Sequence, residues 1–200
     1  MTKVPSILLG RCVHCESELE AELALILDAC PGVMWFGEQP ALLQYTHRGV
    51  IHTHFPDFAV ATTEGREFVE VKFRHQVTDE VLERTALLTQ RLHRYGVGYR
   101  LVTEDQIRGG TALANARKLL VRGREATTPI WTLQAYETVR QRGVTTLADF
   151  DWERPGSFDA AGVARQIIDG RLHIDMTATI GADTPVHLPR ALAKENRLWR

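Results

Sequence analysis

The sequence predicts an α/β fold: a mixed β-sheet flanked by helices, followed by a small C-terminal helical domain. Three observations predict this fold. Residues 55–73 read as two apolar strands joined by a polar turn, helical repeats of apolar residues lie on both sides of that hairpin, and the pattern after residue 110 is mostly helical. The length of 200 residues allows one large or two small domains, and 44% hydrophobic and 24% charged residues are typical of a globular protein.

Periodicity and capping signals give the elements of the first half. In order they are an irregular arm (1–14), a helix from near Cys15 to Pro31-Gly32, a strand (33–36), a hairpin of strands 41–47 and 50–60 around Arg48-Gly49, the strand that carries Glu70, a helix that starts after Thr78 and ends at Gly96, and a last strand (97–102). In the first helix, Glu20 lies beside the apolar stripe that contains Leu19 and Leu23. Glu20 is therefore either an acid that reaches inward or part of a solvated acidic face.

The strand that follows the polar turn carries the most informative residues. Glu70 and Lys72 are two positions apart, so their side chains point to the same face, while Val69 and Val71 take the core face. Burying a Glu and a Lys is costly unless they are paired or bound to a metal. Asp57, on the other arm of the hairpin, is expected to lie beside them.

An Asp followed by Glu-x-Lys on the next strand is a pattern of metal-dependent phosphodiesterases. Two carboxylates suit Mg²⁺ or Mn²⁺, and such an ion polarises the scissile phosphate and lowers the pKa of a bound water. A lysine in that position orients the water or offsets charge in the transition state. The spacing alone leaves open a second interpretation, a surface hairpin whose Glu/Lys pair contributes little to stability.

A polar stretch with two glycines at residues 103–110 indicates a boundary between a domain of residues 1–104 and a second one of residues 105–200. The second half is expected to form helices over 113–121, 130–142 and 158–169, then strands over 172–176 and 184–188. Three helices and a β-wing would be a winged helix, and a small helical bundle is an equal alternative.

Charge is divided unevenly between the two halves. Residues 1–104 contain 10 Lys/Arg and 14 Asp/Glu, and residues 105–200 contain 14 and 11. The basic run Arg117, Lys118, Arg122 and Arg124 makes the second half the expected contact with DNA or a protein partner.

Cys12 and Cys15 form a C-x-x-C pair, and Cys30 stands alone. No second pair completes a zinc site, which favours free thiols in a reducing cytosol. The sequence has no apolar run of membrane-spanning length and no signal peptide, so the expected location is cytoplasmic, with no membrane partner.

Several motifs together resemble the TnsA endonuclease family, a PD-(D/E)xK family of heteromeric transposase subunits with a fold like that of type II restriction enzymes. The motifs are Glu16-Ser17-Glu18-Leu19-Glu20, Leu25-Ile26-Leu27-Asp28, Gly37-Glu38-Gln39-Pro40, Pro56-Asp57-Phe58 and Val69-Glu70-Val71-Lys72. The resemblance continues in Leu101-Val102-Thr103-Glu104 and the helical tail, so it covers nearly the whole chain.

The resemblance implies a restriction-endonuclease-like domain in which Glu20, Asp57, Glu70 and Lys72 are catalytic. It implies Mg²⁺, with Mn²⁺ as a substitute, bound by Asp57, Glu70, Glu20 and the backbone carbonyl of Val71. The implied partners are double-stranded DNA at transposon ends and a DDE-type transposase. In the family, the TnsA-like subunit cuts one strand at each end and the transposase cuts and joins the other, which gives cut-and-paste transposition.

Two other functions remain open from the residues. One is another nuclease of the same superfamily, such as a Holliday-junction resolvase or a repair nuclease. The other is a catalytically silent DNA-binding or scaffold subunit. The presence of all four candidate catalytic residues argues against the silent subunit.

Overall fold

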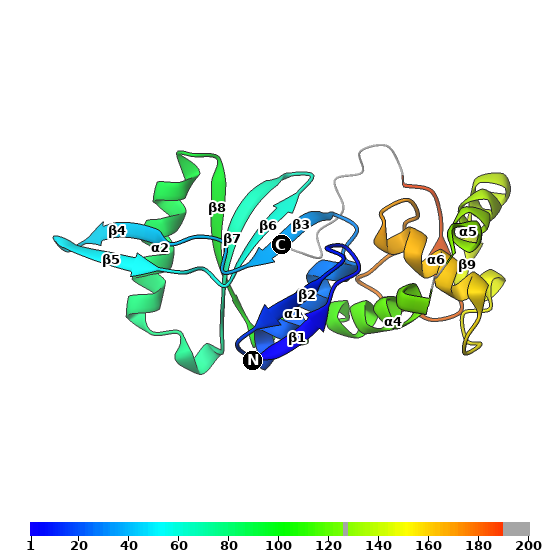
Figure 1. Ribbon diagram of the computed structural model, residues 1–200, viewed down its shortest axis with the longest axis horizontal. Helices are drawn as coiled ribbons and strands as arrows, with labels where there is room; N and C mark the ends of the chain where they lie inside the picture. The colour runs from blue at the N-terminus through cyan, green and yellow to red at the C-terminus, as the bar shows by residue number, and fades with distance from the viewer. Residues whose placement is uncertain (126–127, 190–200) are drawn as a thin grey trace. The chain divides into compact units, whose positions relative to one another are not determined.

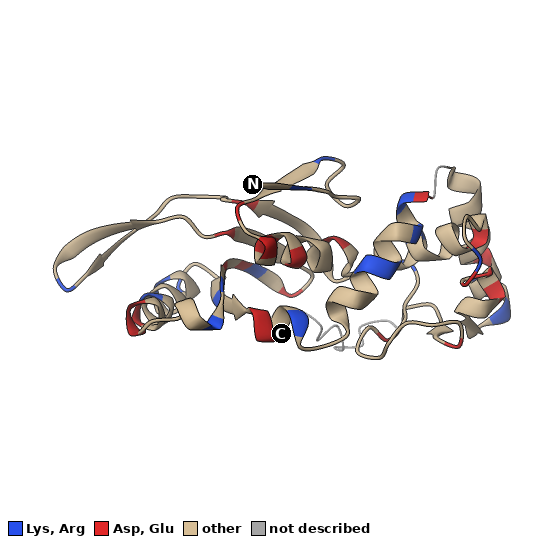
Figure 2. Cartoon of the chain, turned by 90° about the horizontal axis from the view of Figure 1, so that it is seen from below, with Lys and Arg blue, Asp and Glu red and all other residues tan. Residues whose placement is uncertain are grey.

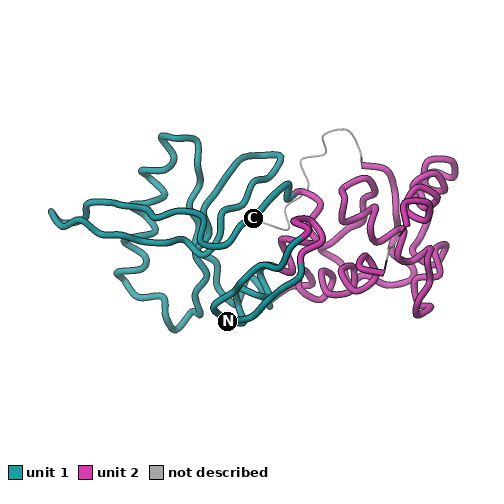
Figure 3. The backbone as a smooth tube through the Cα atoms, viewed as in Figure 1, with its two compact units in different colours: residues 1–5, 11–24, 33–109 teal, residues 6–10, 25–32, 110–200 magenta. Residues whose placement is uncertain are grey.

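The computed structural model describes residues 1–125 and 128–189 (Figure 1). The chain forms two compact units (Figure 3). Unit 1 contains residues 1–5, 11–24 and 33–109, and unit 2 contains residues 6–10, 25–32 and those from 110 onward. The long segments of the two units meet at Gly109 and Gly110, whereas helix α1 (Glu18–Ala29) contributes residues to both.

The core of unit 1 is a four-stranded mixed sheet. Its order is β3 (Val33–Glu38), β6 (Phe58–Thr62), β7 (Gly65–Lys72) and β8 (Val97–Thr103). β3, β6 and β7 pair antiparallel, and β8 runs parallel to β7. Parallel neighbours need a crossover, which helix α2 (Asp79–His93) supplies. The mixed α/β class predicted from the sequence is therefore confirmed.

β6 and β7 form the predicted hairpin. β6 runs to Thr62 and β7 starts at Gly65, so the polar turn between them has two residues, Thr63 and Glu64. Val69 and Val71 are buried on the predicted core face. Glu70, on the opposite face, is only 2% exposed, so both faces of this part of β7 are covered.

The predicted long strand 50–60 is divided in the structure. β5 (Val50–His54) pairs with β4 (Leu43–His47) in a separate two-stranded ribbon, and β6 starts only at Phe58. Pro56 lies in the break, where a residue without a backbone N–H ends a ladder. The ribbon extends away from the four-stranded sheet in both ribbon views (Figures 1 and 2).

The N-terminal arm is ordered, contrary to the prediction. β1 (Thr2–Pro5) and β2 (Cys12–Cys15) form an antiparallel hairpin in which Val4 faces Val13, and both valines are buried. Four-residue strands with one buried position each give too weak an alternation to be detected. Helix α1 starts at Glu18, slightly later than predicted.

The two cysteines of the C-x-x-C pair cannot share a metal as neighbours on one face. Cys12 is exposed and Cys15 is buried, because residues three apart in a strand lie on opposite faces. Burial, with a smaller contribution from the charge of Glu20, raises the pKa of the Cys15 thiol to about 12. We therefore expect iodoacetamide at pH 8 to alkylate Cys12 in the native protein and to leave Cys15 unmodified.

Peptide mass mapping after alkylation checks this expectation. Alkylation in guanidinium chloride should modify both thiols and serves as the control. Equal labelling of Cys12 and Cys15 without denaturant would show that β2 is not folded as described.

Unit 2 is mainly helical. Its helices α4 (Ala112–Glu125), α5 (Pro129–Arg142) and α6 (Phe158–Ile168) confirm the three predicted ones. A short helical turn, η2 (Leu147–Phe150), lies between α5 and α6. Gly162 lets α5 and α6 approach closely, because a Cβ there would lie 2.5 Å from the carbonyl oxygen of Trp131. The remaining helix, α3 (Glu104–Arg108), follows β8 in unit 1.

The predicted wing of strands 172–176 and 184–188 is largely absent. Only His173 and His187 form a bridge, and β10 (Pro185–Val186) pairs instead with β9 (Thr145–Thr146). The segment after residue 175 is held by α4, since the Asn115 side-chain amide donates to the carbonyls of Met176 and Ala178. Backbone groups used by a helix side chain are not available for a strand ladder.

Candidate active site

The C-terminal half of β7 carries a buried carboxylate surrounded by cations. Glu70 Oε1 lies 2.9 Å from Lys72 Nζ and 3.1 Å from Arg84 Nη2, which comes from α2. Glu70 Oε2 lies 3.0 Å from His54 Nε2, at the base of the β4–β5 ribbon. That nitrogen is also 2.8 Å from the Tyr99 hydroxyl, so it is shared, and Oε2 makes no well-directed hydrogen bond within the described chain.

These contacts determine the protonation states of Glu70 and Lys72. Burial acts to raise the pKa of Glu70, but contacts with His54 and Lys72 outweigh it, and the pKa falls below its ordinary value. For Lys72, burial acts to lower the pKa, yet the adjacent Glu70 carboxylate raises it overall. Glu70 is therefore a carboxylate and Lys72 an ammonium across the neutral pH range.

Asp57 is held at the edge of β7 just before β6 begins. The Val71 N–H donates to Asp57 Oδ2 at 2.6 Å. The carboxylate thus occupies the position that the β6 backbone would occupy if β6 started before Phe58. Because the N–H and C=O of one strand residue point the same way, the Val71 carbonyl faces this edge as well. Burial and the charge of Glu70 raise the pKa of Asp57 to about 7, with a smaller contribution from Glu20.

The Glu38-Gln39-Pro40 motif supports the backbone at Asp57. Gln39 has a left-handed φ of 42° and its N–H donates to the carbonyl of Asp57 at 2.9 Å. Its side chain donates to Glu16 Oε1 at 2.7 Å. Glu38 forms two 2.7 Å hydrogen bonds with Arg11, and this contact lowers the pKa of Glu38 to about 2. The motif thus contributes positioning contacts and places no acid against Glu70.

Glu20 is occupied by the start of its own helix. Its Oε1 accepts from Ser17 Oγ at 2.8 Å and its Oε2 accepts from the Glu16 N–H at 2.8 Å, while Ser17 Oγ accepts from the Glu20 N–H at 3.1 Å. Ser17 thus caps the helix as in a capping box, but the carboxylate accepts from the N–H of the preceding residue, Glu16, and from the Ser17 hydroxyl. Glu20 is half-buried and its charge reaches Asp57, but its carboxylate is committed to the cap.

The residues predicted from the sequence are therefore brought together to different degrees. Asp57, Glu70 and Lys72 lie close together at the C-terminal end of β7, the Val71 carbonyl faces the same edge of the strand, and Glu20 acts at longer range. Within residues 1–125 and 128–189, no three His, Cys, Asp or Glu side chains meet in a metal-binding arrangement. The acids point instead to Lys72, Arg84, His54 and the helix cap.

The donor set nevertheless fits a hard divalent cation. Asp57 and Glu70 are close enough to repel each other, and this repulsion adds to the larger effect of burial in raising the pKa of Asp57. Glu70 Oε2 is a buried oxygen without a hydrogen bond in the described chain. Two carboxylates and a backbone carbonyl are oxygen ligands of the kind that Mg²⁺ and Mn²⁺ prefer.

Three residues around Glu70 were not predicted as site residues. They are Arg84, Tyr99 and His54. Arg84 and Tyr99 lie 14 and 29 positions beyond Glu70, and their contacts depend on the packing of α2 and β8. The one sequence signal was the alternation of His52 and His54, which puts both on one face of β5.

We expect His54 to act as a positioning residue for Glu70. His54→Ala should weaken Mn²⁺ affinity by about 10- to 100-fold, because partners of a ligating carboxylate typically have effects of this size. His54→Gln keeps a donor and should recover part of the affinity. Isothermal titration with Mn²⁺ measures the effect without requiring cleavage.

The matched control is His52→Ala. His52 lies on the same ribbon face, stacked on Tyr45 with ring centroids 5.4 Å apart, and does not contact Glu70. Equal losses of affinity in the two variants would mean that the histidines stabilise the ribbon and that His54 has no special role.

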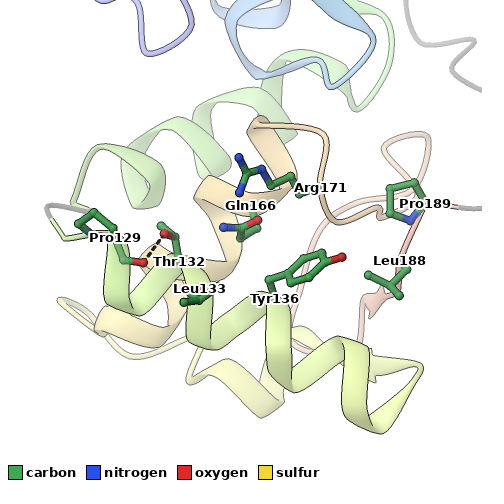
Figure 4. A pocket seen from close by; sticks show the side chains of 8 residues that line it. All are labelled: Pro129, Thr132, Leu133, Tyr136, Gln166, Arg171, Leu188 and Pro189. Carbon is green, nitrogen blue, oxygen red and sulfur yellow. Dashed lines mark hydrogen bonds between the residues drawn. The ribbon is translucent and has the colours of Figure 1, made fainter.

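A cavity of about 770 Å³ lies in unit 2, separate from these residues (Figure 4). Its lining comes from α5, α6 and residues after β10, and consists of Pro129, Thr132, Leu133, Tyr136, Gln166, Arg171, Leu188 and Pro189. None of the sequence-predicted site residues lines it. The volume of this cavity therefore gives no information about the site around Asp57, Glu70 and Lys72 in unit 1.

Comparison with models of known protein families finds no match to this chain, and comparison with curated proteins also finds none. Among the helices of residues 1–125 and 128–189, none is both long and apolar enough to cross a membrane.

Proposed function

We propose that unit 1 is a Mg²⁺-dependent DNA endonuclease. One observation carries this proposal: a nearly fully buried carboxylate, Glu70, is paired with Lys72 on the same strand face, next to Asp57 at the open edge of that strand. A surface hairpin would leave the Glu/Lys pair in water, where it contributes little. Burying charged groups costs free energy, and such buried charged groups are typical of functional sites.

Asp57, Glu70 and the Val71 carbonyl would hold the metal, with Glu20 adding negative charge nearby. A bound Mg²⁺ supplies Lewis-acid polarisation of the phosphate and a water of lowered pKa. The Val71 N–H orients the Asp57 carboxylate by donating a hydrogen bond to it. His54 and Arg84 fix Glu70, so that ligand positions require little reorganisation.

Lys72 contributes the charge that the reaction requires. Its ammonium is half-buried and raised in pKa, so it remains protonated through the neutral range. Beside Asp57 and Glu70, the Lys72 ammonium would stabilise negative charge that develops on the phosphate oxygens, or orient the attacking water. Because that charge is largest in the transition state, the contact affects the rate more than DNA binding.

The narrower proposal is a TnsA-like subunit that nicks transposon ends beside a DDE-type transposase. It is supported by the motif resemblance and by two contacts of Gln39, whose N–H donates to the Asp57 carbonyl and whose side chain donates to Glu16, which give the Glu-Gln-Pro motif a physical role. In the proposed partner surface of unit 2, two of the four basic side chains are engaged by backbone carbonyls of the same unit. Lys118 donates to the Ile180 carbonyl at 2.6 Å and Arg122 donates to the Trp152 carbonyl at 2.7 Å.

A plasmid-nicking assay tests the proposal. The full chain is incubated with supercoiled plasmid in Mg²⁺ or Mn²⁺, with and without a DDE-type transposase. Conversion to open circles that EDTA prevents is the expected result. If the chain leaves DNA intact under all of these conditions, the endonuclease assignment is wrong, and nicking that never responds to a transposase removes the TnsA-like role alone.

A further inference from the structure

The β4–β5 ribbon of unit 1 carries no negative charge. Residues 39–56 contain no Asp or Glu, and they contain Arg48, His47, His52 and His54. Figure 2 shows this as a ribbon without acidic colour that ends in a basic tip. The ribbon closes in a two-residue turn in which Arg48 and Gly49 have φ of 49° and 80°, which gives a tight, twisted hairpin end.

One face of the ribbon is braced by the rest of unit 1. His47 and Arg48 both contact Glu83 of α2, at 3.2 and 2.7 Å. Arg91 of α2 donates to the Thr46 carbonyl at 2.9 Å, and His54 reaches the Tyr99 hydroxyl at the base. These contacts run from the tip to the base, so the ribbon is held in place along its length.

The other face of the ribbon is exposed to solvent. Strand alternation and the pairing of Gln44 with Thr53 and of Thr46 with Ile51 place these four side chains on it. All four are exposed, and Ile51 is 66% exposed. None of their side chains makes a hydrogen bond within residues 1–125 and 128–189. The face thus presents an amide, two hydroxyls and an aliphatic group to solvent.

The base of the ribbon lies next to Glu70 and is close in sequence to Asp57. His54 touches Glu70, and only Phe55 and Pro56 separate His54 from Asp57. A five-residue strand spans roughly 17 Å, which is the length of about five base pairs of duplex. A duplex cut at Asp57 and Glu70 would therefore pass along this ribbon.

We propose that the outer face of the β4–β5 ribbon enters the major groove of DNA beside the cleaved phosphodiester. The major groove accepts a two-stranded ribbon, and Gln, Thr and aliphatic side chains are suited to adenine edges and thymine methyl groups there. The absence of carboxylates favours DNA over a basic protein surface, and the Arg48 side chain at the ribbon tip is 73% exposed even though it is paired with Glu83, so it can also contact a phosphate. The inference rests on the proposed DNA endonuclease function.

The experiment compares two identical charge insertions. Thr53→Glu lies on the outer ribbon face and Thr63→Glu lies in the exposed β6–β7 turn of the same unit. Both are made in the full chain with Asp57→Asn to prevent cutting, and binding to a 30-base-pair duplex of mixed sequence is followed by fluorescence anisotropy in Mg²⁺. Thermal melts confirm that both variants fold.

We expect Thr53→Glu to weaken binding at least about tenfold and Thr63→Glu to stay within about twofold, because a carboxylate in the groove faces phosphates and loses a base contact. Dimethyl sulfate, which methylates guanine N7 in the major groove, should show protection that Thr53→Glu removes. Equal binding by the two variants, with no N7 protection, overturns the proposal. So does a result in which Thr53→Glu changes only self-association, since the face would then bind protein.

These outcomes are separable from those of the endonuclease assignment. If the unmodified chain cuts DNA while the two Glu variants bind alike, only the ribbon inference fails. If Thr53→Glu selectively weakens binding but no condition gives cutting, the ribbon inference stands and the endonuclease assignment fails. If the chain neither binds nor cuts DNA, both are wrong.

Discussion

Replacing Asp57 by Asn is expected to reduce DNA cleavage by at least about 10²–10³-fold, since the negative charge of a proposed metal-binding carboxylate at the reacting centre is removed. The substituted amide still offers an oxygen to the Val71 N–H, so the local backbone is retained. Single-turnover cleavage of a plasmid at saturating protein measures the rate. Glu64→Gln, which removes one acidic charge from the exposed hairpin turn, is the matched control.

The same variant should be more stable than the parent protein at pH 8 in EDTA, by about 1–2 kcal/mol. The pKa of Asp57 is raised from 3.8 to about 7, so between these values the folded protein keeps a proton that the unfolded chain has lost. The free energy of unfolding therefore falls as pH rises through this range, and Asn avoids the fall. Urea unfolding at pH 4 and pH 8 checks this. A variant that cuts at the parent rate, or that loses stability at pH 8, contradicts the assignment of Asp57.

Replacing Lys72 by Ala is expected to lower the cleavage rate by about 10²–10³-fold with near-normal DNA affinity. The ammonium lies 2.9 Å from Glu70 Oε1, where it can reach the reacting phosphate, and only contacts that strengthen in the transition state raise the rate constant. Removing it also leaves Glu70 with Arg84 and His54, which limits structural damage. Binding and single-turnover rates are measured separately.

The control for Lys72 is Lys3→Ala, because Lys3 is the other lysine of unit 1 and is exposed on β1. It should cut at the parent rate. The competing explanation is that Lys72 serves as a structural partner of Glu70. A Lys72→Ala variant with reduced metal or DNA affinity but a parent-like rate at saturation would favour that explanation over the catalytic one.

The sequence predicted the parts of unit 1 that depend on local patterns. The alternation around Glu70 and the capping residue Thr78 identified β7 and α2, and Thr78 Oγ1 accepts from the Val81 N–H as expected of a helix cap. The shared strand face of Glu70 and Lys72 is likewise a consequence of period two. These features need no information beyond a few neighbouring residues.

Other features of unit 1 were not predicted, for two different physical reasons. Arg84 reaches Glu70 because α2 packs against β8, the neighbour of β7, and such a tertiary contact leaves no local pattern in the sequence. The other two cases are local: Glu20 bonds to Ser17, three residues away, although its position beside the apolar stripe indicated that it could reach inward, and Pro56 interrupts the strand predicted over residues 50–60.

Binding of Mn²⁺ tests the central claim, that Asp57 and Glu70 form a divalent-cation site next to Lys72, most directly. The electron paramagnetic resonance signal of free Mn²⁺ is titrated with the full chain and with its Asp57→Asn and Glu64→Gln variants. We predict one site in the parent and in Glu64→Gln, displaced by excess Mg²⁺, and loss of that site in Asp57→Asn. Equal Mn²⁺ binding by all three proteins, or no binding by any, would contradict the account.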